Sequence, residues 1–204
     1  GLGDVYKRQP HVMLSGAGAE EFAKEQGLEM VEDNMYFATP KTMEWIEKLK
    51  QESKKNGTVG CVVLDKQGNL TAGTSTGGMF KKRWGRIGDS PVIGAGTYAD
   101  NNSCAVSCTG HGEYFIRHAV AFDVCARYKY LKESVEKAAD YIIHTELNTN
   151  AGNGGLIAVD KLGNIAMPYN SGGMFRGFLY KEKGSPEIKK GCGIGKKIVV
   201  VGEK

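Results

Sequence analysis

The apolar residues of this chain fall into short runs separated by polar turns, and the sharpest such boundary lies at Thr58. The polar run 50–55 ends at Asn56-Gly57, and the apolar run 59–64 begins directly after Thr58. A short apolar run bounded by turn residues is typical of a buried strand. The pattern therefore predicts that Thr58 opens a buried strand behind a polar tether and a glycine. Taken alone, a β-branched residue at a strand start is ordinary.

Two parts of the chain repeat one pattern at a constant offset of 95 residues. Residues 61–70 and 156–165 each contain an apolar run, an Asp-Lys-x-Gly-Asn turn and a second apolar run. This predicts two equivalent β-hairpins. The alternative is convergent turn chemistry, because such turns require Gly and Asn in any case. The threonine is not repeated, since Asn153 corresponds to Thr58.

The segment between the hairpins predicts a strand followed by two helices. Residues 104–108 form an apolar run, and a helical pattern starts near Gly112 and continues through Val124. The loop Thr109-Gly110-His111-Gly112 would then bring backbone N–H groups to a helix N-terminus, which stabilises negative charge. Residues 134–147 predict a second helix, whose apolar face contains Val135, Ala138, Ala139 and Ile142.

Two shorter helical patterns occur upstream of Thr58. Residues 19–26 predict a helix closed by Gly27. Thr39-Pro40 predicts the start of another helix, with Thr39 as N-cap and Pro40 at the first helical position. The apolar face of this second helix would contain Met43, Ile46 and Leu49. Strands followed by helices and then by strands again indicate an α+β layered fold.

The composition of the chain excludes several classes of protein. A chain of 204 residues with 41% hydrophobic and 25% charged residues can bury the core of one globular domain. The net charge of +4 is modest and no basic run is interleaved with aromatic residues, so nucleic acid is not an expected partner. No apolar stretch approaches the ~20 residues of a membrane span, so a membrane is not expected either.

The cysteines are five in number and include no C-x-x-C pair. This predicts reduced thiols, buried as small hydrophobic residues in a cytoplasmic protein. Zinc binding by Cys104 and Cys108 is the alternative, but no His or Cys stands at a partner spacing, so no metal site is predicted. The cysteines concerned are Cys61, Cys104, Cys108, Cys125 and Cys192.

Several motifs, taken together and in register, resemble one known family. They are Gly57-Thr58-Val59-Gly60 and residues 74–79, 85–91, 94–99 and 107–113. In this combination the sequence resembles the plant-type asparaginase and isoaspartyl peptidase family of N-terminal nucleophile (Ntn) hydrolases. The likeness runs from about Pro10 to about Phe178. It implies a four-layer αββα sandwich, which in this chain would be incomplete at the N-terminus.

The resemblance also implies how the chain is divided. Residues 1–9 match nothing in the family and are expected to be a non-native leader. Residues 10–57 correspond to the C-terminal part of an alpha chain with its linker, and residues 58–204 to a beta chain that begins at the nucleophile, all within one domain. The family's sodium-binding loop lies upstream of this sequence, so no cofactor is expected here. The expected assembly is an alpha-beta heterodimer that pairs into a homodimer of heterodimers.

Thr58 is the nucleophile that the resemblance implies. A threonine hydroxyl needs a base, and cutting the Gly57–Thr58 peptide bond would supply one, because the new α-amine has a pKa of about 7.7 to 8.0. The resemblance implies that the precursor cuts this bond itself, by attack of the Thr58 hydroxyl on the Gly57 carbonyl. Gly57 suits that step because glycine accepts strained backbone angles at little steric cost.

The resemblance carries further roles over by position. Thr109 and Gly110 would form the oxyanion hole, with the Thr109 hydroxyl and the Gly110 N–H directed at the developing negative oxygen. Thr76 would position or assist Thr58. His111 is expected to be a side chain of the pocket wall, because the α-amine already serves as base. Taken singly, Thr109 as a helix-entry residue and Thr76 as a turn hydroxyl are ordinary alternatives.

Substrate binding is expected to depend on three further positions. Arg86 would bind the substrate α-carboxylate, because a guanidinium fork fits a carboxylate bidentately. Asp89 would bind the α-ammonium, and Gly110 and Gly112 would present backbone to the same amino-acid moiety. The ordinary alternative for Arg86 and Asp89 is a surface salt bridge.

The expected activity is hydrolysis of the side-chain amide of L-asparagine and of β-aspartyl (isoaspartyl) dipeptides, which releases L-aspartate. One alternative is a glycosylasparaginase, which residues 74–76 and 94–96 also resemble. Against it, those enzymes usually carry Asp where Gly57 stands and cysteines suited to disulfides. A second alternative is a non-catalytic or unprocessed homologue that binds an amino acid. The complete set of polar site residues argues against that alternative.

Overall fold

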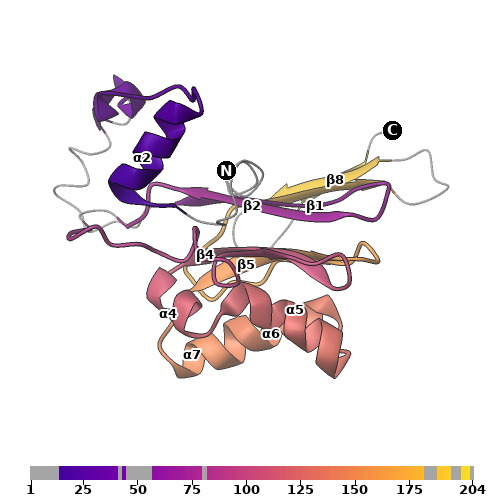
Figure 1. The fold of residues 1–204 in the computed structure, drawn as a ribbon. Coiled ribbons are helices and arrows are strands. Elements are labelled where there is room, and N and C mark those ends of the chain that lie inside the picture. The colour runs from indigo at the N-terminus through magenta and orange to yellow at the C-terminus, as the bar shows by residue number, and fades with distance from the viewer. Residues whose placement is uncertain are drawn as a thin grey trace. The chain divides into compact units, whose positions relative to one another are not determined.

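We describe a computed structural model of the chain, which covers residues 14–40, 43–44, 57–79, 82–181, 188–193 and 199–202. The chain divides into two compact units, Gly1–Lys54 and Lys55–Lys204, and each is described by itself. Figure 1 shows the helices and strands of both units.

The first unit contains a helix α2, Gly16–Glu25, and a 3-10 helix η1, Asn34–Phe37. α2 confirms the helix predicted from residues 19–26. Asp33 caps η1, because its side chain accepts a hydrogen bond of 2.8 Å from Met35 N. Such a cap satisfies a backbone donor that has no partner within the helix.

The helix predicted to start at Thr39 is described only at its beginning. Met43 N donates a hydrogen bond of 2.9 Å to Thr39 O, which is the spacing of an α-helical turn. Ile46 and Leu49 of the predicted apolar face lie outside the described residues, as does the polar tether 50–55.

The second unit begins with a hairpin. Strand β1, Thr58–Leu64, pairs antiparallel with strand β2, Leu70–Thr76, so that Thr58 lies opposite Thr76. This confirms the strand predicted after Gly57 and the first of the two predicted hairpins.

The prediction that this first strand is buried is wrong for half of its side chains. Val59 is 74% exposed and Val63 is 47% exposed. Val62 and Leu64 face the other way and pack against buried residues of the unit. Successive side chains of a strand point to opposite faces, and only one face of β1 is covered by described residues.

The second predicted hairpin is also confirmed. Strand β5, Gly154–Asp160, pairs antiparallel with the short strand β6, Ile165–Ala166. It belongs to a larger sheet with the order β3-β4-β5-β6, in which β3 is Thr97–Ala99 and β4 is Cys104–Gly110. β4 confirms the strand predicted from residues 104–108.

This four-stranded sheet is covered on both faces. One face packs against the β1–β2 hairpin through a small apolar cluster that contains Leu70, Ala105 and Val159. The other face packs against helices through a larger cluster, in which Val106, Cys108, Leu156 and Ala158 of the sheet meet Phe115, Val124, Ala138 and Ile142 of the helices. Figure 1 shows the hairpin on one side of β4 and β5 and the helices on the other.

The helix predicted to run from Gly112 through Val124 is two helices, α4 (Gly112–Arg117) and α5 (Val120–Leu131). Ala119, between them, has a left-handed backbone with φ of 45°. The reason lies in the next turn: Phe122 N donates to Gly94 O at 2.8 Å, so the start of α5 is tied to a loop outside the helix. A continuous helix would use that N–H internally.

The last predicted helix is confirmed with a local change of winding. It consists of α6 (Val135–Tyr141), a π-helical turn η2 (Ile142–Glu146) and α7 (Leu147–Thr149). Ser134 caps α6 by accepting a hydrogen bond of 3.2 Å from Lys137 N. The predicted apolar face is buried in the core.

A third sheet follows at the end of the chain. Its strands pair in the order β7-β8-β9, with β7 at Arg176–Lys181, β8 at Ile188–Gly193 and β9 at Val199–Gly202.

The prediction that all cysteines are buried is wrong at two positions. Cys61 and Cys192 are exposed, whereas Cys104, Cys108 and Cys125 are buried, and all five are free thiols. Cys61 is exposed because it lies on the same open face of β1 as Val59.

The α+β fold class is confirmed by this arrangement of sheets and helices. Within the second unit, two sheets lie face to face and one layer of helices covers the far side of the larger sheet (Figure 1). A second helix layer, on the outer face of the β1–β2 hairpin, is not formed by the described residues of this unit. The four-layer sandwich therefore stays a prediction.

Candidate active site

Thr58 is the first residue of β1, and its hydroxyl has a defined partner. Thr58 Oγ1 donates to Thr76 Oγ1 at 3.3 Å, and Thr76 Oγ1 donates in turn to Gly57 O at a long 3.5 Å. Gly78 N fixes the Thr76 hydroxyl by donating to it at 3.0 Å. The register of the hairpin places the two threonines opposite each other. The Thr76 hydroxyl therefore lies between the Thr58 hydroxyl and the carbonyl of the preceding peptide bond.

Hydrogen bonds between three further hydroxyls connect the β1–β2 hairpin to the four-stranded sheet. Thr74 Oγ1 and Ser107 Oγ share a hydrogen bond of 2.7 Å, and the Thr97 hydroxyl also donates to Thr74. A side chain at Gly60 would collide with Ser107 Oγ, so the two sheets approach closely there. No sequence pattern predicts this network, because its members come from the three separate strands β2, β3 and β4.

The packing of the two sheets determines which strand ends meet. Leu70, which lies opposite Leu64 at the end of β1, donates through its backbone N–H to Asn101 Oδ1 at 2.7 Å just before the start of β4, while Gly60 lies against Ser107 further along β4. β1 and β4 therefore run in opposite directions across the interface. Thr58, at the start of β1, consequently lies toward the same end of the unit as Thr109, near the end of β4.

Close backbone packing explains the glycines at this end of β4. Gly110 pairs with Gly154 of β5, and their φ angles are 152° and 156°. A side chain on either residue would collide with the backbone of the opposite strand, and its Cβ would lie 2.8 Å from the ring of Phe115. Only glycine fits under these contacts. His111 N then donates to Asn153 O at 3.0 Å, which continues the pairing into the loop.

Arg86 and Asp89 lie against the start of α4. A Cβ on Gly112 would be 2.7 Å from Asp89 Oδ1 and 3.0 Å from Arg86 Nη2, so Gly112 gives both side chains room. Arg86 itself makes a bidentate ion pair with Glu113, from Nε to Oε1 at 2.8 Å and from Nη2 to Oε2 at 2.7 Å. Arg86 and Asp89 therefore both lie next to the loop that follows β4.

Asp89 is a buried carboxylate, only 6% exposed. Burial raises its pKa above the ordinary value, although the nearby Arg86 guanidinium acts in the opposite direction. Its Oδ2 atom has no hydrogen-bond partner among the described residues. A buried carboxylate oxygen of this kind favours a cationic or N–H ligand, because an unpartnered buried charge is costly.

The pKa of Glu113 is lowered, whereas that of Asp89 is raised. The hydrogen bond from Arg86 lowers the pKa of Glu113 to about 2. The same bond raises the pKa of Arg86. Glu113 is therefore ionised throughout the neutral range. No sequence pattern predicts the pairing of Glu113 with Arg86, because 27 residues separate the two.

His111 stands at the edge of this group. Its side chain is 44% exposed, and Nε2 lies 3.5 Å from Glu113 Oε2. Its ring packs edge-on against Tyr114 with the ring centroids 5.1 Å apart. His111 therefore lies beside Glu113, next to the predicted site residues. Among the described residues, it makes no hydrogen bond to Thr58.

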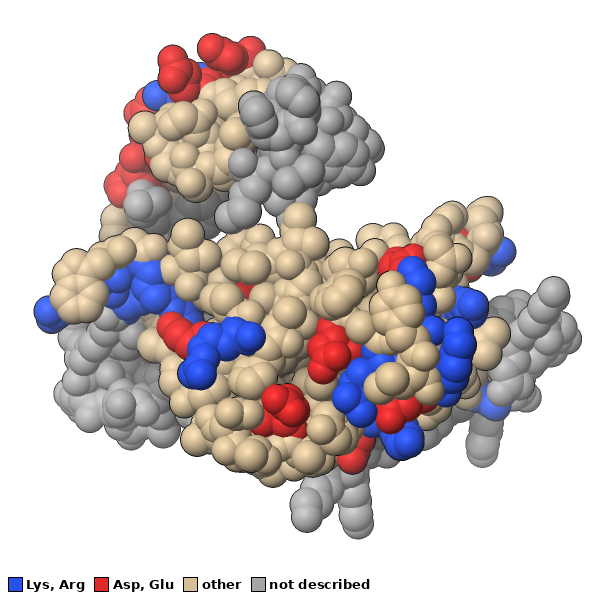
Figure 2. Space-filling model, turned by 60° about the horizontal axis from the view of Figure 1, so that its bottom comes forward, with Lys and Arg blue, Asp and Glu red and all other residues tan. Residues whose placement is uncertain are grey.

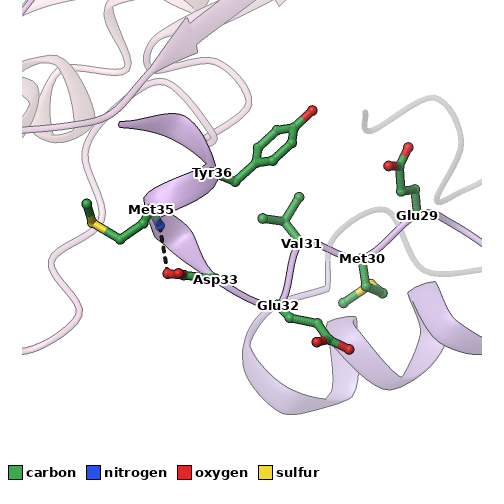
Figure 3. A pocket seen from close by; sticks show the side chains of 7 residues that line it. All are labelled: Glu29, Met30, Val31, Glu32, Asp33, Met35 and Tyr36. Atoms are coloured by element: carbon green, nitrogen blue, oxygen red, sulfur yellow. Dashed lines mark hydrogen bonds between the residues drawn. The ribbon is translucent and has the colours of Figure 1, made fainter. Parts of the chain in front are cut away.

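A separate hollow of about 380 Å³ lies in the first unit. Figure 3 shows its lining side chains, among them Tyr36, Val31 and Glu29. One continuous stretch of chain, residues 29–36, supplies all of them, and Met35 and Tyr36 are largely exposed.

Comparison with known proteins identifies the relationship that these features suggest. Residues 3–188 match the sequence profile of a family described as Asparaginase. The chain belongs to the asparaginase family. Among its relatives, the isoaspartyl peptidase of Salmonella typhimurium is 46% identical over 190 residues, which cover 86% of this chain and 60% of that protein.

More distant organisms carry similar asparaginase-family proteins. The probable isoaspartyl peptidase/L-asparaginase 2 of Arabidopsis thaliana is 42% identical, over 85% of this chain and 62% of that protein. The human isoaspartyl peptidase/L-asparaginase is 38% identical, over 83% of this chain and 57% of that protein. The chain thus spans about 60% of the length of the curated relatives it matches.

Charges of both signs are mixed on the helical face of the second unit. Figure 2 shows Lys and Arg side chains interspersed with Asp and Glu on the face that carries the helices of the second unit, without a large patch of one sign. Within the part of the chain that the structure describes, no group of three or more His, Cys, Asp or Glu is arranged to hold a metal ion. None of the described helices is long and apolar enough to cross a membrane.

Proposed function

We propose that the full-length protein is a threonine hydrolase that cleaves the side-chain amide of L-asparagine and β-aspartyl (isoaspartyl) dipeptides, releasing L-aspartate. The observation that carries the proposal is the chain of hydroxyls from Thr58 through Thr76 to the Gly57 carbonyl. The relatives' names, isoaspartyl peptidase and isoaspartyl peptidase/L-asparaginase, support the same substrates.

The first step in this proposal is cleavage of the Gly57–Thr58 bond by Thr58 itself. The Thr58 hydroxyl lies within hydrogen-bond distance of Thr76 Oγ1, and the Thr76 hydroxyl lies at the limit of that distance from Gly57 O. Thr76 is thus placed to relay the proton that Thr58 Oγ1 loses as it attacks the Gly57 carbonyl carbon. The C–N bond then breaks as the Thr58 nitrogen takes up this proton, which leaves Gly57 bound to Thr58 Oγ1 as an ester. Water hydrolyses the ester, which frees the Gly57 carboxylate and the Thr58 hydroxyl. After cleavage the α-amine of Thr58, with an ordinary pKa of about 7.7 to 8.0, serves as the base.

Thr109 and Gly110 form the oxyanion hole in this proposal. Both residues lie at the end of β4. The packing of the two sheets places the start of β1, and with it Thr58, toward the same end of the unit. Fixed donors of this kind stabilise a developing oxyanion, and one such donor is typically worth ~3 to 4 kcal/mol.

Arg86 and Asp89 bind the two charged groups of the substrate's α-carbon. Arg86 pairs with the carboxylate and the buried Asp89 accepts the ammonium, while Gly112 keeps the space between them open. Blocking the ammonium would leave the buried Asp89 without a partner, and blocking the carboxylate would leave the remaining donors of Arg86 unfilled. Each loss should cost more than one extra methylene, which is worth about 1 to 3 kcal/mol.

The same proposal covers organisation and assembly. Residues 10–57 end an alpha chain, residues 58–204 form a beta chain, and two such heterodimers pair within a four-layer αββα fold. The enzyme needs no catalytic metal or organic cofactor, since amine, hydroxyls and backbone donors supply the chemistry. We place it in the cytoplasm, where its free cysteines would stay reduced.

The test is made on the full-length parent protein. Ammonia release from L-asparagine should exceed that from glutamine, and N-acetyl-asparagine should be a much poorer substrate than glutamine, because its ammonium is blocked. Comparable turnover of asparagine and its N-acetyl derivative would contradict the role of Asp89.

A variant of Thr58 distinguishes the enzyme from a homologue that binds the amino acid without catalysis. When cleavage before residue 58 is achieved with an inserted protease site, Thr58→Val should bind L-aspartate with nearly unchanged affinity and lose turnover, since the hydroxyl is needed only on the way to the acyl-enzyme. Retained turnover in this variant would overturn the nucleophile assignment. Aspartate binding by a verified, processed wild type that releases no ammonia would favour the binding protein.

A further inference from the structure

We propose that Glu113 is a positioning residue for Arg86, which fixes the guanidinium so that its free donor edge faces the carboxylate of the bound amino acid. This inference rests on the proposed role of Arg86 in substrate binding. Glu113 touches no reacting atom, and it acts only through Arg86.

The geometry of the ion pair leaves one donor edge of Arg86 unused. Glu113 accepts from Nε and from Nη2, at 2.8 and 2.7 Å. A guanidinium has five N–H donors, so two remain on Nη1 and one on Nη2. One hydrogen of each points the same way and forms a second fork that fits a carboxylate bidentately. The pair with Glu113 therefore orients Arg86 without using its whole binding capacity.

Two glycines confine the same guanidinium. A Cβ on Gly88 would lie 2.6 Å from Arg86 Nη1, and a Cβ on Gly112 would lie 3.0 Å from Nη2. The side chain of Arg86 is only 19% exposed. The guanidinium thus lies in a slot whose walls are backbone, and Glu113 closes the side that carries Nε.

The charges in the group explain why a second carboxylate is useful there. Glu113 neutralises Arg86 through the fork, and the hydrogen bond from Arg86 keeps the pKa of Glu113 at about 2. Asp89 then makes no hydrogen bond to Arg86 among the described residues, and its buried Oδ2 has no partner. A zwitterionic ligand would supply an ammonium to Asp89 and a carboxylate to the free fork of Arg86.

The competing explanation gives Glu113 the opposite effect. If Glu113 only occupied the carboxylate site of the free protein, a ligand would have to displace it, and removing its charge would tighten binding. If Glu113 positions Arg86, removing its charge weakens binding. The sign of the change in affinity therefore separates the two explanations.

A matched ion pair elsewhere in the same unit serves as control. Arg127 and Glu133 form the same type of fork, from Nε to Oε2 at 2.9 Å and from Nη2 to Oε1 at 3.3 Å, between residues outside the candidate site. Their side chains are 17% and 12% exposed, so the pair is at least as sheltered as Arg86 and Glu113. Glu133→Gln therefore reproduces the loss of a fork without touching the ligand.

The experiment is calorimetric titration of the full-length protein with L-aspartate. Glu113→Gln should raise Kd roughly 10- to 100-fold, the range expected for charge-assisted hydrogen bonds, whereas Glu133→Gln should leave Kd unchanged. In an Arg86→Ala background, Glu113→Gln should have no further effect, because Glu113 acts through Arg86. Glu113→Asp, which keeps the charge, should recover part of the affinity and serves if the Gln variant does not fold.

Three results would overturn the proposal. They are an unchanged or tighter Kd in Glu113→Gln, an equal loss in Arg86→Ala and wild-type backgrounds, and no aspartate binding by the wild type. Failure of the proposed function has a different signature, namely absence of ammonia release by the processed wild type. The titration decides the role of Glu113 in that case too, because it measures binding of an amino acid and not turnover.

Discussion

The two hairpins of the second unit share one turn but lie in different surroundings. In the first, Asp65 Oδ1 accepts from Asn69 N at 2.7 Å, and in the second, Asp160 Oδ1 accepts from Asn164 N at 2.9 Å. In both, the Asn side chain also donates to the second oxygen of the same carboxylate, at 2.9 and 2.8 Å. The local sequence therefore specifies the turn independently of what covers it.

The burial of the two hairpins differs sharply. Six of the seven residues of β5 are buried, whereas β1 has no fully buried residue. β5 lies between β4 and β6 in the larger sheet, while β1 pairs only with β2 among the described strands. The difference shows how one local pattern can serve two purposes: the second hairpin builds the core, and the first presents Thr58 at an accessible strand start.

The largest expected effect contrasts Thr58 with Asn153, which stands at the equivalent position just before β5. Thr58→Ala should reduce asparagine turnover by about 10⁴-fold or more, because the nucleophile is lost. Asn153→Ala, at the equivalent position of the second hairpin, should change turnover less than about tenfold, since Asn153 contributes its backbone oxygen to the site loop. Ammonia release under saturating asparagine measures both, and similar losses would remove the functional distinction between the hairpins.

Glycine replacements test how closely each hairpin is packed. A Cβ on Gly155 would lie 2.6 Å from Tyr169 Cβ and 2.9 Å from Pro168 O, so Gly155→Ala should destabilise the fold by about 3 kcal/mol. Gly60→Ala, which meets the Ser107 hydroxyl, should cost about 1 to 2 kcal/mol. Denaturant unfolding measures each.

Gly73→Ala is the matched control for these replacements. Gly73 lies in the first hairpin, and a Cβ there would meet nothing within 4 Å. The change should therefore alter the free energy of unfolding by less than about 0.5 kcal/mol. A loss at Gly73 as large as that at Gly60 would contradict the packing described for the two sheets.

Replacing the turn aspartate should also destabilise the second hairpin more than the first. Asp160 is 1% exposed and its side chain accepts hydrogen bonds from Leu162 N, Asn164 N and Asn164 Nδ2, so Asp160→Ala removes a buried carboxylate that pairs with three donors and should cost about 1 to 3 kcal/mol. Asp65 is exposed, and water can satisfy the donors that Asp65→Ala releases. The loss should therefore be smaller in the first hairpin. Thermal or denaturant unfolding of the two variants makes the comparison, and equal losses would show that burial does not decide the cost.

The smallest expected effect concerns acid. Hydrogen bonds from Asn69, followed by weaker backbone contributions, lower the pKa of Asp65 below its ordinary value. A carboxyl with a lowered pKa stabilises the fold fully above the unfolded pKa of 3.8 and loses that contribution as pH falls through the lower folded pKa. The stability difference between wild type and Asp65→Asn should accordingly shrink below about pH 4. A difference that grows in acid would reverse the sign.

The sequence predicted those parts of the fold that depend on local patterns. Both hairpins, β4 and the helix after Ser134 follow from apolar periodicity and turn residues, and all were confirmed. The break at Ala119 was missed, because it depends on hydrogen bonds to the distant loop at Gly94. The exposed face of β1 was missed for a related reason, since a short apolar run does not reveal how many of its faces are covered.

The candidate site shows the same limit. Thr58 and Thr76 were predicted by position, and the hairpin register brings their hydroxyls within hydrogen-bond distance. Thr74 with Ser107, and Arg86 with Glu113, are contacts between segments far apart in the chain, so neither periodicity nor spacing could reveal them. The catalytic roles themselves stay predictions.

The central claim is that Thr58 cuts the bond before it and then acts as nucleophile, and intact-mass analysis of the full-length parent after prolonged incubation tests it most directly. Wild type should yield two chains that part between Gly57 and Thr58, and Thr58→Ala should stay one chain. Because Thr76 holds the Thr58 hydroxyl, Thr76→Val should slow the cut. An alanine variant that splits at this bond without added protease, or a wild type that hydrolyses asparagine while the bond remains intact, would contradict the account.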